Sequence, residues 1–219
     1  MTPRSWYTSD LHFGHEKIIG YSGRPFSDAR HMDREMVRRW NAVVGPQDVV
    51  HVLGDFAMSR HEPYLNSLNG MKILVRGNHD HGNLAKISAG WNHVCEYYEK
   101  MEGTVPVVML HYPIESWNRM RFGAVHLHGH CHGSLRRKLR NRCDVGVECW
   151  DYAPVSFEEI VKRCSQYPAE DVDHHAEGHG AMAQETVRGV GADVVRAGEA
   201  RGVENCDVGV GGNFGGDGS

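Results

Sequence analysis

The sequence has no apolar run of about 18 residues, the length that a membrane-spanning helix requires. Its six cysteines form no Cys-x-x-Cys pair and follow no regular spacing, and no internal repeat is evident. We therefore expect neither a transmembrane protein nor a disulfide framework. The chain is long enough to bury a core without disulfides, so we expect reduced thiols.

Little sequence precedes the first polar motif, which begins at Asp10. This leaves no room for a signal peptide ahead of the motif. We expect a cytoplasmic protein without a membrane partner.

Charge and glycine are unevenly distributed along the 219 residues. Residues 1–164 carry a net charge of +3, whereas residues 165–219 carry −7. Of the 26 glycines, 12 lie beyond Tyr167, where aromatic residues are few. We predict one folded domain over residues 1–166, followed by a disordered, glycine-rich acidic tail over residues 167–219.

Apolar segments alternate with segments of helical periodicity, which is typical of an α/β protein. Strands are predicted over residues 4–9, 48–55, 71–76, 92–101, 104–110, 124–128 and 143–148. Helices are predicted over residues 34–44, 60–68, 83–89 and 157–165. Asp33 and Ser156 are the expected N-terminal caps of the first and last helices. Residues 16–32 are expected to form a loop, and Glu102-Gly103 a hairpin turn.

Five of the apolar segments end in side chains that can bind a metal ion. The ends read Asp10-x-His12, Gly54-Asp55, Gly77-Asn78-His79-Asp80, His111 and Gly129-His130-x-His132. A plain turn would use glycine and asparagine but would need neither the histidine nor the aspartate. The i,i+2 spacing in the first and last motifs lets both side chains address one site. Because ligands collect at the carboxyl ends of strands in α/β sheets, we expect these side chains to converge.

The candidate metal ligands are two carboxylates, one amide oxygen and four imidazoles. They are Asp10, His12, Asp55, Asn78, His111, His130 and His132. Seven ligands are too many for one tetrahedral ion and suit two divalent ions that share a carboxylate. Mixed nitrogen and oxygen donors favour Mn²⁺, Fe, Zn²⁺ or Ni²⁺ over Ca²⁺ and Mg²⁺. Mn²⁺ is our first expectation.

In this order, the five motifs resemble those of the calcineurin-like metallophosphoesterase superfamily, over roughly residues 5–160. Phe13-Gly14-His15 and Arg24-Pro25-Phe26 resemble the small bacterial and phage-type phosphoesterases of that superfamily. The resemblance implies two packed mixed β-sheets flanked by helices, an αββα sandwich.

The resemblance also implies a role for each ligand. The first metal ion would be held by Asp10, His12 and His132. The second would be held by Asn78, His111 and His130. Asp55 would bridge the two ions, and His79 matches the catalytic histidine of the superfamily.

A site of this kind hydrolyses phosphate esters with a metal-activated water. The two cations clamp the phosphate oxygens and neutralise the charge that builds during displacement. His79 would stabilise the transition state or protonate the leaving oxygen. Asp80 follows directly and would orient His79 or raise its pKa. We therefore assign catalytic roles to His79 and Asp80.

Other residues allow two interpretations each. His15 and Arg24 could bind substrate phosphate or could be ordinary loop residues. Arg76 could bind phosphate through its guanidinium or form a salt bridge. His111 taken alone could be a hydrogen-bonded core histidine, and the basic residues within 136–142 could steer nucleic acid or form a solvated surface. Ordinary packing is expected for the histidines inside apolar segments, which are His51, His126 and His128.

The function that these residues favour is a phosphodiesterase acting on a nucleotide or nucleic-acid substrate. A phosphomonoesterase, including a protein phosphatase, is the nearest alternative. A non-catalytic metal-binding scaffold on the same fold, and a nucleic-acid binder that uses residues 136–142 without metal, stay open.

Overall fold

The computed structural model of the chain describes residues 2–58, 60–80 and 88–169. The tail predicted over residues 167–219 and the helix predicted over residues 83–89 lie almost wholly outside these ranges. Within the described ranges, no helix is long and apolar enough to cross a membrane.

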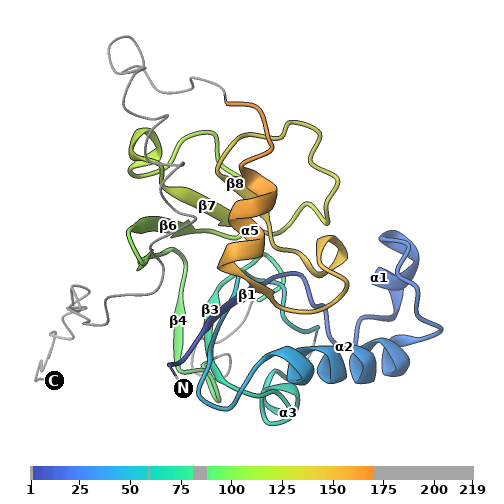
Figure 1. The fold of residues 1–219 in the computed structure, drawn as a ribbon. Helices are drawn as coiled ribbons and strands as arrows, with labels where there is room; N and C mark the ends of the chain where they lie inside the picture. The colour runs from blue at the N-terminus through green and yellow to red at the C-terminus, as the bar shows by residue number, and fades with distance from the viewer. Residues whose placement is uncertain (1, 59, 81–87, 170–219) are drawn as a thin grey trace, which may run out of the picture.

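The first sheet has five strands in the order β4-β3-β2-β1-β9. They are β1 (Ser5–Thr8), β2 (Val49–Val52), β3 (Met71–Val75), β4 (His93–Cys95) and β9 (Val155–Ser156). Strands β4, β3 and β1 of this sheet are labelled in Figure 1. Strands β1 to β4 run parallel, and β9 runs antiparallel to β1. In parallel strands that are covered on both faces, successive residues are all buried, instead of alternating between buried and exposed. This explains why Val50, His51 and Val52 are all buried.

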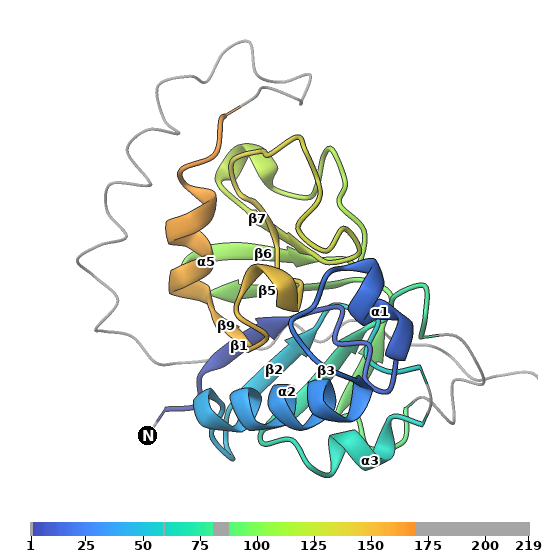
Figure 2. The same cartoon turned by 90° about the vertical axis from the view of Figure 1, so that its right-hand side faces the viewer.

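Three helices cover one face of the first sheet. They are α1 (Glu16–Tyr21), α2 (Ala29–Val43) and α3 (Glu62–Leu65). In α2 the buried residues Met32, Met36 and Trp40 recur every four positions and pack against the apolar side chains of the sheet. Figure 2 shows α2 lying across the strands of this sheet.

Helix α2 begins earlier than the sequence predicts. Asp28, not Asp33, caps it, because the Asp28 carboxylate accepts the backbone N–H of His31 at 2.7 Å. Asp33 instead accepts the N–H of Gly14 and the hydroxyl of Tyr64. The loop prediction for residues 16–32 is also wrong in part, since α1 occupies its beginning.

The second sheet has four strands in the order β5-β6-β7-β8. They are β5 (Tyr98–Glu102), β6 (Val105–Met109), β7 (Val125–His128) and β8 (Arg142–Asp144). The β5–β6 pair is antiparallel, which confirms a hairpin, and its turn is Gly103-Thr104 because Glu102 pairs with Val105. The remaining pairs are parallel. The strand predicted over residues 92–101 is in fact two strands, β4 and β5, in different sheets. The strand predicted over residues 143–148 ends at Asp144, and the 3-10 helix η2 (Val147–Cys149) follows.

A second core cluster joins the two sheets. It contains Tyr7 in β1 and Leu53 just after β2, together with Met109 and Leu127 of the second sheet. Ile160 of helix α5 (Phe157–Cys164) also belongs to it. Ser156 caps α5, as predicted. The fold is therefore mixed α/β with two mixed sheets and a few helices.

The fold is not a clear αββα sandwich, and the expectation of flanking helices holds for the first sheet only. The outer side of the second sheet is covered by Trp117, which packs on Val108 and Ala124, and by the 3-10 helix η1 (Met120–Phe122). Helix α5 packs against β1, β8 and β9, and its buried face belongs to the core between the sheets.

Candidate metal centre

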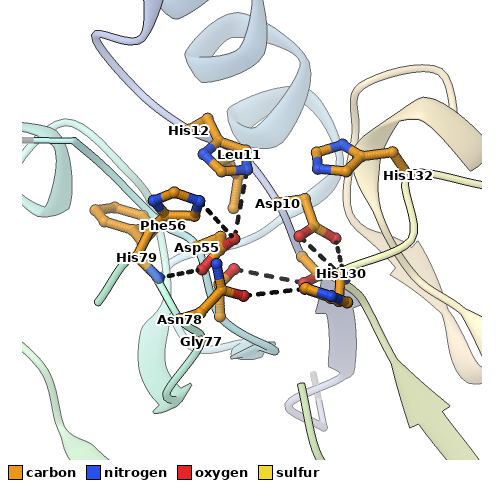
Figure 3. A network of polar contacts seen from close by, with 12 residues as sticks. Asp10, Leu11, His12, Asp55, Phe56, Gly77, Asn78, His79, His130 and His132 are labelled. Carbon is orange, nitrogen blue, oxygen red and sulfur yellow. Dashed lines mark hydrogen bonds and ion pairs between the residues drawn. The ribbon is translucent and has the colours of Figure 1, made fainter. Parts of the chain in front are cut away.

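Five of the seven predicted ligands have a left-handed backbone. Their φ values are 57° at Asp10, 51° at His12, 54° at Asp55, 68° at His130 and 46° at His132. Positive φ is uncommon for residues other than glycine, and it concentrates at functional sites, where the surrounding structure holds the strain. The chain therefore turns sharply at the strand ends, and these turns bring the ligands toward one centre (Figure 3).

Asp10, His12 and His132 form the first group, with ligand atoms within 4.8 Å of one another. The two imidazoles stack with ring centroids 5.3 Å apart. Both ring nitrogens of His12 are buried and lack a hydrogen-bond partner within the described part of the chain. Burial lowers the pKa of His12 to about 2, so its imidazole is neutral and offers a lone pair. A buried, unpartnered imidazole beside a carboxylate fits a divalent metal ion.

Asp10, Asp55 and His111 form the second group, again with ligand atoms within 4.8 Å. The His111 Nδ1–H donates to the Leu53 carbonyl at 2.7 Å, which leaves the Nε2 lone pair facing Asn78 Oδ1 at 3.0 Å. Two acceptors that face each other are satisfied by a cation. His111 is thus both a hydrogen-bonded core residue and a member of the centre.

Asn78 and Asp55 connect the remaining ligands. Asn78 Oδ1 lies 2.9 Å from His130 Nδ1, so the amide joins His111 and His130. Asp55 Oδ2 lies 3.5 Å from His12 Nε2 and 3.7 Å from His111 Nε2 (Figure 3). The Asp55 carboxylate therefore faces both groups, as a bridging ligand would, while Asp10 belongs to both.

His79 lies at the edge of this centre. Its backbone N–H donates to Asp55 Oδ1 at 2.8 Å, and its side chain is 43% exposed. Its ring centroid is 5.2 Å from that of His12. The imidazole can therefore meet a substrate from solvent while its backbone is held by a predicted ligand.

Asp80 is placed differently from the prediction. Its fully buried carboxylate accepts the backbone N–H groups of Asp55, Phe56 and Gly77 at 2.8, 3.1 and 2.8 Å. These contacts tie the second motif to the third. The contacts of Asp80 thus position the loop that carries His79 rather than the His79 ring itself.

The three predicted substrate-binding residues differ in their burial and in the groups that they contact. Arg24 is buried and donates to the carbonyls of Asp10 and Leu11, so it supports the first motif from within. Arg76 forms a salt bridge, which was the second of its two predicted roles. Its Nη1 lies 2.5 Å from Glu96 Oε1. His15 lies beside the first ligand group, with its ring centroid 5.5 Å from that of His12.

Glu148 contacts the candidate centre but was not among the site residues predicted from the sequence. Its Oε1 lies 2.7 Å from His132 Nδ1 and 2.6 Å from Arg24 Nη2. Burial alone would raise the pKa of Glu148, but the hydrogen bond from His132 and the charge of Arg24 lower it below its usual value. The available signal was a carboxylate at the end of the apolar segment 143–148, which also contains Asp144.

Two glycines allow the strand ends to pack this closely. A Cβ at Gly77 would lie 2.4 Å from Asp55 Oδ1, and one at Gly129 would lie 1.9 Å from Ser9 Oγ and 2.5 Å from Asp10 Oδ2. No side chain fits at either position.

The histidines inside apolar segments pack as expected. His51 stacks on Tyr7, and His126 Nδ1 lies 3.2 Å from the Val108 carbonyl. In the basic segment, Arg142 is buried and donates to backbone carbonyls, while Arg136 and Arg140 are exposed.

The fold and the donor set together define a mixed α/β protein with two overlapping groups of candidate metal ligands. No family model matches the chain. The chain is 33% identical over 165 residues to the uncharacterized protein MJ1445 of Methanocaldococcus jannaschii, which covers 70% of this chain and 87% of that protein. It belongs to the same family as MJ1445.

Two further similarities agree with this relationship. The Gene 66 protein of Mycobacterium phage L5 is 25% identical over 205 residues, which cover 78% of this chain and 98% of that protein. The crystal structure of AQ665, a protein of unknown function from Aquifex aeolicus, matches with a TM-score of 0.60 and 22% identity, covering 74% of this chain and 100% of that one. The latter similarity concerns the fold alone.

Proposed function

We propose that this protein is a dinuclear metal-dependent phosphoester hydrolase of the calcineurin-like metallophosphoesterase superfamily. The observation that carries the proposal is the pair of overlapping ligand groups, which share Asp10 and include the unpartnered His12 ring. A single-ion site would not require two groups of buried carboxylate and imidazole within 4.8 Å.

Each ligand has an expected place in this centre. The first ion would be held by Asp10, His12 and His132. The second would be held by Asn78, His111 and His130. Asp55, which faces both groups, would bridge the ions.

The donor chemistry favours Mn²⁺, with Fe, Zn²⁺ or Ni²⁺ as alternatives. Two such ions supply Lewis acidity, which neutralises phosphate charge and activates water near neutral pH.

The chain itself contributes proton transfer and positioning. His79 is exposed at the edge of the centre, and its backbone N–H is fixed by Asp55 Oδ1. From that position its imidazole can donate a proton to the leaving oxygen or stabilise charge on the phosphate. Asp80 supports this role through the backbone of the loop.

The substrate is proposed to be a phosphodiester of a nucleotide or nucleic acid. Tyr112 supports this, because it is 42% exposed and its ring lies 4.8 Å from that of His130, beside the second ligand group. Exposed aromatic rings beside a phosphate site can stack on nucleobases. Arg136 and Arg140 are exposed in the segment that follows His132 and could contact further phosphates. We also propose a cytoplasmic location.

Comparing two chromogenic substrates tests this proposal. With added Mn²⁺, the protein should hydrolyse bis(p-nitrophenyl) phosphate faster than p-nitrophenyl phosphate. The reverse order would favour a phosphomonoesterase. Tightly bound metal without hydrolysis of either compound would favour a non-catalytic scaffold.

A further inference from the structure

Glu148 contacts one ring nitrogen of His132, a residue of the first ligand group. It lies in η2, after β8, whereas His132 follows β7. The Glu148 side chain is 11% exposed and the His132 side chain 22%. The distance between His132 Nδ1 and Glu148 Oε1 is 2.7 Å, within the range of a charge-assisted hydrogen bond.

This contact fixes which nitrogen of His132 can bind a metal ion. An ionised carboxylate can only accept a hydrogen bond, so Nδ1 must carry the proton. In the neutral ring, the other nitrogen, Nε2, keeps its lone pair. His132 belongs to the ligand group of Asp10 and His12, so that lone pair is available to the first ion.

Glu148 is itself held by Arg24. The guanidinium, whose side chain is fully buried, donates through Nε and Nη2 to Glu148 Oε1 at 2.9 and 2.6 Å. The same guanidinium donates to the carbonyls of Leu11 and Asp10 at 2.9 and 2.7 Å. One arginine therefore links the backbone of the first motif to the carboxylate that orients a ligand of the last motif.

Glu148 contacts a candidate ligand without belonging to either ligand group, although its Oε2 is buried and has no hydrogen-bond partner within the described residues. It is absent from both groups of described residues whose ligand atoms lie within 4.8 Å of one another. The neighbouring carboxylate, Asp144, cannot replace it, because Asp144 accepts the backbone N–H groups of Gly133 and Gly146.

We propose that Glu148, fixed by Arg24, is the positioning residue that orients His132 for the first metal ion. This inference rests on the proposed dinuclear centre. It assigns to the Arg24-Pro25-Phe26 segment a structural reason for its arginine, namely the support of one metal site rather than contact with substrate phosphate.

The test measures ion binding separately from catalysis. Chelator-treated wild type, Glu148→Gln and Glu148→Ala are titrated with Mn²⁺ by calorimetry, and ¹⁵N NMR of the histidines reports the His132 tautomer.

Glu148→Ala should weaken the binding of one of the two ions about 10- to 100-fold and leave the binding of the other unchanged. Glu148→Gln keeps an acceptor for Nδ1–H, so its loss should be smaller. The exposed Glu158→Gln variant removes the same charge elsewhere and should bind both ions like wild type.

The outcomes separate the inference from the proposed function. If wild type binds two ions and both Glu148 variants bind them equally well, the inference is wrong and the proposed function stands. If wild type binds no divalent ion, the proposed function is wrong, and the inference with it. A fall in affinity for both ions together would also contradict a role confined to His132. Should Glu148→Ala fail to fold, the Glu148→Gln titration and the NMR tautomer decide the question.

Discussion

The Asp10 carboxylate accepts the backbone N–H of His130, at 3.1 Å to Oδ1 and 3.0 Å to Oδ2. These residues stand 120 positions apart in the chain and at the ends of strands in different sheets. Close by, Ser9 and Gly146 form an isolated parallel bridge that also joins the two sheets. The candidate metal centre thus lies where the two sheets meet, and its geometry depends on how closely the sheet ends approach.

Gly129→Ala tests that dependence. The added Cβ would overlap Ser9 Oγ and Asp10 Oδ2, so the two sheet ends must separate. We expect a loss of about 1–3 kcal/mol in the free energy of unfolding and a loss of metal affinity. Chemical denaturation and Mn²⁺ titration measure the two effects. The matched control is Gly20→Ala, because a Cβ at that helical position meets no atom within 4 Å. If the two variants had the same free energy of unfolding and the same metal affinity, the close approach of Gly129 to Ser9 and Asp10 would be contradicted.

His79→Asn separates catalysis from metal binding. The His79 ring is not among the two ligand groups, so metal content should equal that of wild type. Turnover should fall about 10²- to 10⁴-fold, because proton transfer to the leaving group is lost. Elemental analysis and initial rates on bis(p-nitrophenyl) phosphate give the two quantities. Loss of a metal ion in this variant would refute the assignment of His79.

Asp80→Asn distinguishes loop positioning from direct action on His79. An asparagine has a single acceptor oxygen, whereas the Asp80 carboxylate uses both oxygens to accept three backbone N–H groups. At least one buried N–H would lose its partner, at a cost of about 1–3 kcal/mol in the free energy of unfolding. Thermal unfolding measures this loss. Unchanged stability with an altered pH–rate profile would instead favour direct contact with the His79 ring.

The buried His51 predicts a specific sensitivity to acid. Burial lowers its pKa to about 3, so the folded chain keeps it neutral where the unfolded chain, with a histidine pKa of about 6.5, binds a proton. Stability is therefore lost as pH falls below the unfolded value, by about 2 kcal/mol between pH 8 and pH 5. His51→Phe keeps the stacking on Tyr7, whose ring centroid lies 5.1 Å away, and removes the titrating group.

Thermal unfolding in the presence of a chelator, at pH 8 and at pH 5, measures this effect. The Tm of His51→Phe should fall less between these values than that of wild type. His93→Phe, at an exposed position, serves as the control and should behave like wild type. If the Tm of all three proteins fell by the same amount between pH 8 and pH 5, His51 would not be the source of the acid sensitivity.

The sequence was sufficient to predict most of the strands and the polar motifs that follow them, although not where every strand ends. Parallel strands appear as continuous apolar runs, and polar residues directly after such runs stand out. The motifs after β1, β2, β3, β6 and β7 were all found in this way. Helix α5 was equally predictable, because Ser156 and Glu159 form the local capping box that begins it.

The contributions of Glu148 and Arg24 could not be read from the sequence, because their partners lie far away along the chain. Arg24 and Glu148 are separated by 124 positions, and only the meeting of the two sheets brings them together. The division of residues 92–101 between two sheets was hidden for a related reason. The apolar and polar pattern of that segment does not record which sheet each half joins.

A calorimetric titration of chelator-treated wild-type protein with Mn²⁺, followed by assay of each titration point on bis(p-nitrophenyl) phosphate, tests the dinuclear centre most directly. We predict two ions bound per chain, no hydrolysis without metal, and full activity only when the second ion is bound. Binding of one ion or none, or hydrolysis that persists in the chelator, would contradict the account.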